Sequence, residues 1–495
     1  MNSYNISPTI NPNRVFILQK SELEKRWNPL YYASNVFKFL KTTNFDIKTV
    51  SEISEYTISG FGVGKEAQDS SENGFIQIRP TNLDELGNLK FDRNVFLDES
   101  YLESKKSNII KRNDILFNNT NSQELVGKTA FFDLEGIYFH SNHITRIRVN
   151  ENVIRPKFLW ILLNLYQEKK IFYTLCTNWN NQSGVGTELL NSIKLIIPSF
   201  EIQDKIIQIK EDSLNHKRQN EAEAEKLLAS IDAYLLGALG ITLPTPQENT
   251  LKNRIFTTQL SEVSGGRFDP KLYSQKTKDL ISSIYKTKYN HSPLKLIVIQ
   301  SFAGDWGNDD NETYDNDDFV RCLVIRATEF DNKFNLNVDG SRAKFRLINK
   351  LKYQNLDIQT NDLLIEKSGG SDNQPVGRIS ILTKDLTENY VLGYSNFIHK
   401  LRVDSSKVTA EYVFSYLKTL HNIKITDVMQ SQTNGIKNLI LNEYLKLPIP
   451  IPPLDKQQEI ADHITAIRQQ AQQLKDKTKD LLAKASSEIE EILLN

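Results

Sequence analysis

A glycine-rich stretch contains residue types that could bind a phosphate group. Gly60-Phe61-Gly62-Val63-Gly64-Lys65 places three glycines ahead of a lysine. A Walker A loop also needs a glycine five places before the last one and a serine or threonine after the lysine. Those two places hold Ser59 and Glu66. We therefore expect a glycine turn, either a plain turn or one whose backbone a ligand approaches closely.

Four other stretches carry incomplete catalytic or metal-binding patterns. Asn28-Pro29-Leu30-Tyr31 lacks the second proline of the Asn-Pro-Pro-Tyr motif of amino-methyltransferases, and Glu103-Ser104-Lys105 lacks the preceding Pro-Asp of a nuclease site. His140 and His143 would point to opposite faces of a strand, which disfavours shared metal ligation. The acidic run 305–318 lacks the spacing of an EF-hand. We expect no catalytic, cofactor-binding or metal site in this chain.

The charge balance narrows the classes of protein that the chain can belong to. Its 495 residues hold 61 Lys+Arg and 61 Asp+Glu, a formal net charge of +0. This excludes a polybasic nucleic-acid tail and an acidic solvating chain. The cysteines, Cys176 and Cys322, form neither a disulfide framework nor a Cys-x-x-Cys zinc motif. The polar residues 1–13 lack a signal-peptide core, and no apolar run could span a bilayer. We expect a cytoplasmic protein without a membrane partner.

An internal repeat runs through almost the whole chain. The matches stay in the same order in both halves, which a chance alignment would not do over this length. They pair Asn13-Arg14-Val15-Phe16 with Asn253-Arg254-Ile255-Phe256, Ile78-Arg79-Pro80-Thr81 with Ile325-Arg326-Ala327-Thr328, Asn113-Asp114-Ile115-Leu116 with Asn361-Asp362-Leu363-Leu364, Ser141-Asn142 with Ser395-Asn396, Arg148-Val149 with Arg402-Val403, and Pro198, Gln203 and Ile206 with Pro452, Gln457 and Ile460.

Each copy is expected to hold a mixed α+β domain followed by a long helix. β-branched and aromatic runs predict strands at Phe75–Ile78 and Val320–Ile325. Apolar stripes predict short helices at Arg155–Lys169 and Ala410–Leu420. The expected divisions are a first domain at 1–200, a central helix at 201–240, a linker at 241–250, a second domain at 251–453 and a C-terminal helix at 454–495.

The long helix of the second copy carries an apolar seam typical of a coiled coil. The seam residues are Ile460, Ile464, Ile467, Ala471, Leu474, Thr478, Leu481, Ala485 and Ile492, with a gap at position 488. The helix of the first copy is polar in the middle, from His216 to Glu221. Because the duplication supplies both partners, we predict that the two helices pair within the chain as an antiparallel coiled coil. A coiled coil between two chains is the alternative.

Basic and polar residues near the repeat anchors are candidates for nucleic-acid binding. Lysine and arginine neutralise phosphates, and amides and hydroxyls can read base edges. Arg342, Lys344 and Arg346 would share one face of a strand. An ordinary solvated surface is the alternative for every one of them. The candidates are Lys65, Arg79, Thr81, Asn82, Lys105, Lys106, Lys111, Arg112, Asn118, Asn119, Thr120, Arg326, Thr328, Arg342, Lys344, Arg346, Lys352, Lys367, Ser368 and Ser371.

The ordered set of motifs resembles the specificity (S) subunits of type I restriction-modification systems. The residues that carry the resemblance are Arg26-Trp27-Asn28-Pro29, Arg267-Phe268-Asp269-Pro270, Gly304-Asp305-Trp306-Gly307, Ser183-Gly184-Val185-Gly186-Thr187, Leu447-Pro448-Ile449-Pro450 and Leu454-Asp455-Lys456-Gln457-Gln458-Glu459-Ile460. The stretch Ile197-Pro198-Ser199-Phe200-Glu201 is a degenerate version of the family's Pro-Pro-Leu-Asp pattern.

The resemblance implies a function as well as an α+β fold. Two tandem α/β target-recognition domains would be separated by a pair of long antiparallel helices. Each domain would read one half of a split double-stranded DNA sequence. The helices would dock methyltransferase (M) subunits, two of them by the symmetry of the repeat, and restriction (R) subunits could join. S-adenosylmethionine, ATP and magnesium would belong to those partners, with no cofactor in this chain.

Two other functions remain open from the sequence. A stand-alone DNA methyltransferase or nuclease would bind S-adenosylmethionine, or cut DNA with magnesium, without a partner. A coiled-coil scaffold with two interaction domains would show no preference for any DNA sequence.

Overall fold

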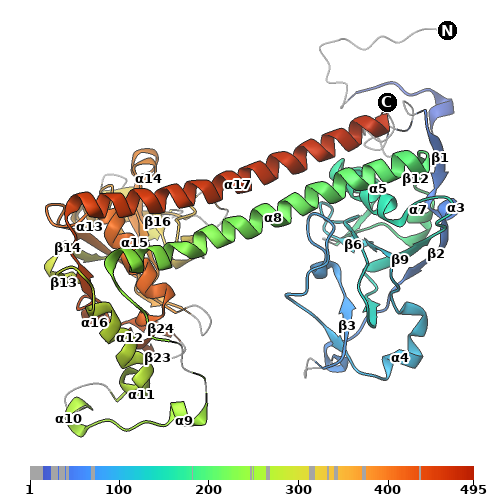
Figure 1. Ribbon diagram of the computed structural model, residues 1–495. Coiled ribbons are helices and arrows are strands. Elements are labelled where there is room, and N and C mark those ends of the chain that lie inside the picture. Colours follow the sequence, from blue (N-terminus) through green and yellow to red (C-terminus); the bar gives the residue numbers. More distant parts are fainter. Residues whose placement is uncertain are drawn as a thin grey trace. The chain divides into compact units, whose positions relative to one another are not determined.

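The computed structural model of the chain consists of two compact units (Figure 1). One unit comprises Met1–Glu221 and Lys475–Asn495, and the other comprises Ala222–Leu474. Both units therefore contain part of each long helix. The structure describes residues 15–23, 32, 40, 44–68, 73–180, 182–245, 248, 250–263, 268–310, 318–331, 334–338, 340, 344–370, 375–433 and 436–494.

The first unit is built on a four-stranded antiparallel sheet with the strand order β2-β9-β5-β7. Its strands are β2 (Ser54–Ser59), β9 (Ile144–Val149), β5 (Ile115–Asn118) and β7 (Thr129–Phe131). Helix α5 (Pro156–Glu168) packs on this sheet and buries most of its apolar residues. The helix starts at Pro156, because proline fits the first helical position, where no backbone N–H is needed.

Smaller sheets complete the first unit. They combine β4 (Phe96–Leu97), β3 (Phe75–Ile78) and β8 (Tyr138–His140), then β10 (Thr177–Trp179), β11 (Gln182–Gly184) and β6 (Thr120–Asn121), and finally β1 (Asp46–Thr49) with β12 (Lys194–Ile197). Short helices lie between them, namely α3 (Val50–Ile53), α4 (Tyr101–Ser104), α6 (Ile171–Leu175) and α7 (Thr187–Asn191).

The second unit repeats this arrangement, with one additional strand, β15, in one of its sheets. Strands β14 (Val298–Ala303), β22 (Ile398–Val403), β18 (Leu363–Glu366) and β20 (Ile379–Ile381) form the four-stranded antiparallel sheet. The other sheets are β15 (Asn308–Asp309), β17 (Phe345–Asn349), β16 (Phe319–Ile325) and β21 (Leu392–Tyr394); β19 (Ser368–Gly369), β24 (Ile436–Leu439) and β23 (Gln430–Thr433); and β13 (His291–Pro293) with β25 (Pro448–Pro450). The predicted duplication is therefore confirmed as a duplicated topology.

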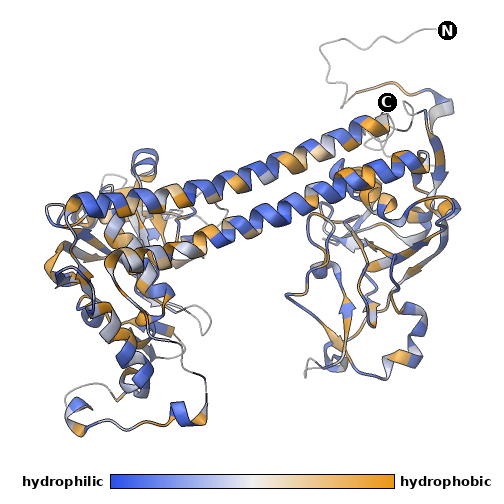
Figure 2. Ribbon diagram, in the orientation of Figure 1, coloured by the Kyte–Doolittle hydropathy of each residue, from blue (hydrophilic) through white to orange (hydrophobic). Residues whose placement is uncertain are grey.

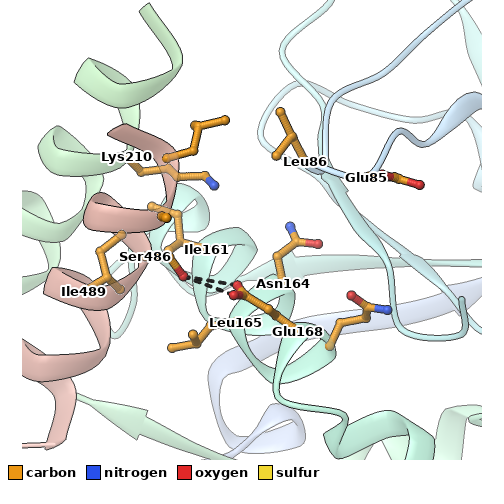
Figure 3. A pocket seen from close by; sticks show the side chains of 12 residues that line it. Glu85, Leu86, Ile161, Asn164, Leu165, Glu168, Lys210, Ser486 and Ile489 are labelled. Carbon is orange, nitrogen blue, oxygen red and sulfur yellow. Dashed lines mark hydrogen bonds between the residues drawn. The ribbon is translucent and has the colours of Figure 1, made fainter. Parts of the chain in front are cut away.

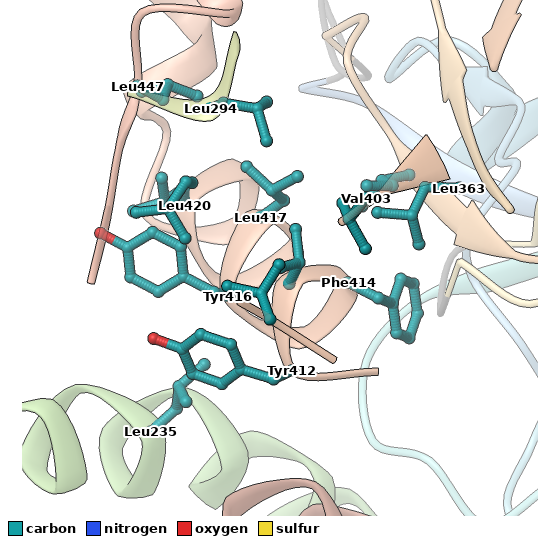
Figure 4. Close-up of a cluster of buried hydrophobic side chains, with 14 of the residues drawn as sticks. Leu235, Leu294, Leu363, Val403, Tyr412, Phe414, Tyr416, Leu417, Leu420 and Leu447 are labelled. Atoms are coloured by element: carbon teal, nitrogen blue, oxygen red, sulfur yellow. The ribbon is translucent and has the colours of Figure 1, made fainter. Parts of the chain in front are cut away.

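The helices of the second unit follow the same plan. Helix α15 (Ala410–Asn422) takes the place of α5, and its side chains form the centre of the core shown in Figure 4. The buried tyrosines Tyr412 and Tyr416 each donate a hydroxyl hydrogen bond to a carbonyl of β25, at Pro450 (2.9 Å) and Pro448 (3.1 Å). The remaining helices are α9 (Leu251–Arg254), α10 (Leu260–Val263), α11 (Pro270–Tyr273), α12 (Gln275–Tyr285), α13 (Lys350–Leu356), α14 (Lys384–Asn389) and α16 (Leu441–Tyr444).

Two long helices, α8 (Phe200–Leu239) and α17 (Leu454–Leu494), run through both units. In the first unit, Ile206 of α8 shares a core with Leu493 of α17. In the second unit, Leu235 of α8 shares a core with Ile460 of α17. The start of one helix thus packs with the end of the other, which confirms the antiparallel pair within one chain. Hydrophobic residues recur along both helices in Figure 2.

The apolar seam of α17 departs from its predicted course near the C-terminus. Its buried positions continue from Ala485 to Ile489 and Leu493, whereas Ile492 is only half-buried. The predicted gap at 488 is confirmed by the exposed Glu488, and Ile492 packs against the core as predicted, but the prediction missed the more deeply buried Ile489 and Leu493. A straight α-helix has 3.6 residues per turn, so a seam drifts away from strict heptad spacing. The division of the chain into five domains stays a prediction, although both long helices end within a residue or two of the expected bounds.

Candidate nucleic-acid interface

In the first unit, the glycine-rich stretch forms a loop that begins at the end of β2. A Cβ atom on Gly60 would lie 2.1 Å from the carbonyl oxygen of His140, so only glycine fits this backbone crossing. The next residue, Phe61, stacks on Tyr101 with ring centroids 5.5 Å apart. The ammonium group of Lys105 lies 5.3 Å from the centroid of the Phe61 ring. An aromatic pair with an adjacent cation thus forms on this loop.

Arg79 belongs to the same cluster. Its guanidinium Nε and Nη2 donate to Oε1 of Gln77 at 3.2 and 3.1 Å. The buried Gln77 in turn donates from Nε2 to the carbonyl oxygen of Phe61 at 2.8 Å. Partial burial lowers the pKa of Arg79 from its ordinary value. We call Phe61, Gln77, Arg79, Tyr101 and Lys105 the Phe61 cluster.

The equivalent loop of the second unit has different chemistry. Gly304 takes the place of Gly60, since its Cβ would lie 2.1 Å from the carbonyl oxygen of Tyr394. Trp306 follows, and the guanidinium of Arg346 lies 4.4 Å from its ring centroid. Arg346 also donates to the carbonyl oxygens of Trp306 (2.7 Å) and Gly307 (3.0 Å). We call Asp305, Trp306, Asp309, Arg346 and Lys352 the Trp306 cluster.

Acidic side chains neutralise the cations of the Trp306 cluster. Arg346 pairs with Asp309 at 2.5 Å, and Lys352 pairs with Asp305 at 2.8 Å. Arg346 is buried, whereas Lys344 is exposed. Lys344 and Arg346 therefore do not form an open basic face, because Arg346 pairs with Asp309 of β15 and lies against the Trp306 ring.

Several predicted site residues are buried and already hydrogen-bonded. Asn82 donates to the carbonyl oxygen of Lys90 (3.0 Å), Asn118 donates to that of Leu125 (3.2 Å), and Asn119 donates to Thr145 Oγ1 (2.9 Å). The hydroxyl of Ser368 donates to Asn438 Oδ1 at 2.7 Å. The expected placement of Asn118, Asn119 and Ser368 in open loops is wrong, since strands continue through these positions or end beside them. Asn82 follows the Phe75–Ile78 strand as predicted, but it is buried at the end of a short 3-10 turn, Pro80–Asn82. We therefore leave them out of the candidate interface.

The remaining predicted residues that the structure describes are exposed to solvent or half-buried. Thr81 and Thr328 are exposed, while Thr120 and Lys367 are half-buried. Arg326 pairs with Glu329 at 2.6 Å. Arg342 and Ser371 lie outside the described residues. In the part of the chain that the structure describes, no acidic side chain pairs with the exposed cations Lys65, Lys106, Lys111, Arg112 and Lys344.

The aromatic members of both clusters were not predicted from the sequence. The two loops were noted, the first for its glycines and the second as part of a resemblance, but Phe61 and Trp306 were not named as candidates. Trp179, which is 46% exposed at the end of β10, was not predicted either. The Trp179 ring covers Gly184, which pairs with Thr120 across the β11-β6 ladder. Trp179 stands between Asn178 and Asn180, and an aromatic residue among amides in the sequence could have been read as a signal for base stacking.

The described residues contain neither a cluster of metal ligands nor a helix that could span a membrane. Within the ranges given above, no three His, Cys, Asp or Glu side chains gather closely enough to hold a metal ion. None of the helices in the described part of the chain is long and apolar enough to cross a membrane.

The chain thus consists of two copies of one α+β module, each with a cation–aromatic cluster on the same loop. Residues 18–226 and 308–483 match the family model described as the type I restriction modification DNA specificity domain. Because these matches cover most of the chain, it belongs to the type I restriction-modification DNA specificity family and is a specificity subunit. Such a subunit is the recognition component of its system and not the enzyme.

The chain is also similar to proteins of other type I systems. A putative type I restriction enzyme specificity subunit, MjaX, from Methanocaldococcus jannaschii is 23% identical over 394 residues, which is 77% of each chain. One solved chain comes from a study of the assembly and conformational transition of a type I system (14% identity, 91% of this chain and 96% of the other, TM-score 0.47). Another is the S subunit from M. genitalium (12% identity, 91% and 96%, TM-score 0.40).

Proposed function

We propose that each unit reads one half of a split, asymmetric double-stranded DNA sequence. The observation that supports this proposal most directly is the contrast between the Phe61 cluster and the Trp306 cluster. The same loop of the same fold carries a Phe–Tyr stack with a lysine in one unit. In the other it carries a Trp–Arg pair whose arginine binds Asp309, next to an ion pair between Lys352 and Asp305. A common scaffold with different contact chemistry suits two different half-sites.

The groups in and around the clusters suit different parts of DNA. Exposed Lys65, Lys106, Lys111 and Arg112 can neutralise phosphates, which position a protein without reading sequence. Arg79 is held by Gln77 through two hydrogen bonds, and a guanidinium oriented in this way can bind guanine with two hydrogen bonds. We assign phosphate contacts to the exposed lysines and base contacts to Arg79 and its counterpart Arg326.

The proposed partners supply the chemistry. Methyltransferase subunits, one for each half of the pseudo-symmetric chain, would dock on α8 and α17, and restriction subunits would join that core. S-adenosylmethionine, ATP and magnesium would be bound by those partners. The balanced charge of this chain fits such a division, because the partners would then share the phosphate contacts.

The test is to map methylated bases in a host that expresses this chain together with its methyltransferase subunit. We expect two short defined blocks around a fixed unspecified gap. Phe61→Ala should relax only one block and Trp306→Ala only the other, whereas Tyr285→Ala, a change at an exposed aromatic outside both clusters, should leave the motif unchanged. Methylation that does not depend on this chain would contradict the proposal and favour a scaffold.

A further inference from the structure

A cavity of about 280 Å³ lies in the first unit, outside both clusters (Figure 3). Helix α5 forms one wall with Ile161, Asn164 and Leu165. The long helices contribute Lys210 from α8 and the last turns of α17, and a loop at Glu85 and Leu86 forms the far side. All of its lining residues belong to the first unit.

The lining is apolar at its centre and polar at its edge. Leu86, Ile161, Leu165 and Ile489 supply aliphatic surface. At the edge, the hydroxyl of Ser486 donates to a carboxylate oxygen of Glu168 at 3.1 Å. Glu85 and Lys210 add one charge of each sign. Such a site suits a ring that has an apolar body and one hydrogen-bonding edge.

The second unit covers the equivalent wall with one of its own side chains. Gly87 and Phe334 occupy the same position of the same turn, since Gly87 N–H donates to Asp84 and Phe334 N–H donates to Asp331. Both have a positive φ, 79° and 69°. The Phe334 ring is 5% exposed and lies 4.9 Å from the ring of His421 and 5.1 Å from the ammonium of Lys418.

These contacts of Phe334 identify the wall that it covers. Helices α5 and α15 are counterparts of equal length, so Lys418 corresponds to Asn164 and His421 to Gln167. Asn164 and Gln167 both line the cavity of the first unit. An aromatic ring therefore packs in the second unit against the helix face that borders open space in the first.

The first unit cannot use its own turn residue in the same way. A Cβ on Gly87 would lie 2.5 Å from Nε1 of Trp160 and from Nδ2 of Asn164. The backbone of the turn instead contacts α5 directly, and Trp160 Nε1 donates to the Gly87 carbonyl oxygen at 3.0 Å. The close contact requires glycine and leaves this position without a side chain.

We propose that the cavity binds an aromatic side chain with a hydrogen-bond donor, a tryptophan or a tyrosine, from the subunit that docks on α8 and α17. This inference rests on the proposed function, because it takes the docking subunit from it. An apolar cavity of about 150 Å³ already holds a benzene ring, so the volume suffices for an indole or a phenol. The carboxylate of Glu168 is placed to accept the donor of the ring.

The binding of a free ring tests the cavity itself. The fluorine NMR signal of 5-fluoroindole should broaden when the full chain is added. Ala483→Phe places a ring in the cavity from an exposed position on α17 and should abolish this broadening. Ser487→Phe adds the same ring at an exposed position that does not line the cavity and should leave it intact. Equal broadening with Ala483→Phe would overturn the assignment.

The affinity for the methyltransferase subunit tests the role of the cavity. We expect Ala483→Phe to weaken the complex by tenfold or more and Ser487→Phe to leave its dissociation constant unchanged. Equal affinity of the wild-type and Ala483→Phe chains would overturn the inference and leave the proposed function standing. The absence of any complex with the wild-type chain would overturn both.

Discussion

Each unit has one buried carboxylate that stabilises its own central sheet, Asp114 in the first unit and Asp362 in the second. Asp114 pairs with Arg148 of β9 at 2.6 Å, and Asp362 pairs with Arg402 of β22 at 2.7 Å. Both carboxylates have 0% exposed side chains. Burial raises the pKa of Asp114, and the neighbouring arginines act in the opposite direction. All four residues are matching anchors of the internal repeat, but the repeat alone does not indicate that they pair.

Removing either carboxylate should strongly destabilise its unit. Asp114→Asn leaves a buried guanidinium without its counter-charge, which costs about 3 kcal/mol or more in unfolding free energy. Asp362→Asn should have a similar effect in the second unit, where it removes the carboxylate beside the fully buried Lys400 and one of the two carboxylates that pair with Arg402. Urea denaturation followed by circular dichroism measures both, with Glu103→Gln, an exposed glutamate, as the control. A loss below about 0.5 kcal/mol, the range of ordinary surface changes, would contradict the assigned role.

Buried histidines should make the protein less stable in acid. Burial lowers the pKa of His140 and of His399 to about 4, below the ordinary value of 6.5. Between these values the unfolded chain binds a proton that the folded chain does not, so stability falls as the pH drops below about 6.5. Each histidine should cost about 1 kcal/mol between pH 7.5 and 5.5, given 1.36 kcal/mol per pKa unit.

A variant at His399 can separate this effect from general acid sensitivity. Nε2 of His399 lies 2.8 Å from the hydroxyl oxygen of Ser301. His399→Gln keeps a polar partner for Ser301 but does not titrate, so its melting temperature should fall less between pH 7.5 and 5.5 than that of the wild type. An identical fall in both proteins would show that His399 does not contribute.

At the scale of elements, one glutamine in each unit joins the start of a long helix to the domain that precedes it. These residues are Gln203 on α8 and Gln457 on α17. Gln203 donates from Nε2 to the carbonyl oxygen of Pro198 (2.9 Å) and accepts the backbone N–H of Arg155, the residue that caps α5 (2.8 Å). Gln457 makes the same two contacts with Pro452 and Thr409, both at 2.9 Å. In each unit, one buried amide group therefore links the start of a long helix to the start of the helix beneath it.

Replacing these glutamines should loosen both junctions to the same extent. Gln203→Ala removes the buried partner of two backbone groups and should cost about 1–3 kcal/mol, and Gln457→Ala should cost a similar amount. Gln208→Ala is the matched control, since Gln208 is an exposed residue of α8 whose side chain donates to Asp212 in a solvent-exposed pair. Hydrogen exchange at the start of α5 and α15 measures the change. Protection equal to that of the control would refute the junction role.

At the scale of the whole molecule, electrostatics should govern DNA affinity in spite of the balanced net charge. Lys111 is exposed at the end of the first unit's central sheet and is one of the proposed phosphate contacts. Lys111→Gln should reduce the slope of log affinity against log salt by about 1, and it should weaken all DNA sequences equally. Lys226→Gln, an 80% exposed lysine on α8, is the control. An unchanged slope for Lys111→Gln would exclude that phosphate contact.

The sequence by itself determined the duplication, the two long helices and several elements of each unit. The strand at Phe75–Ile78 and the helices at Pro156–Glu168 and Ala410–Asn422 were predictable because periodicity and proline punctuation act locally. The collinear matches predicted the duplicated topology, because two copies that keep the same anchor residues in the same order fold alike.

Only the tertiary structure decided which polar groups face the solvent. Arg346 is buried because it binds the carbonyl oxygen of Trp306, 40 positions away along the chain. Asn119 is buried because it bonds Thr145, 26 positions away. The cavity beside α5 depends on whether a turn carries Gly87 or Phe334. Such outcomes depend on contacts between distant segments, which leave no periodic signal in the sequence.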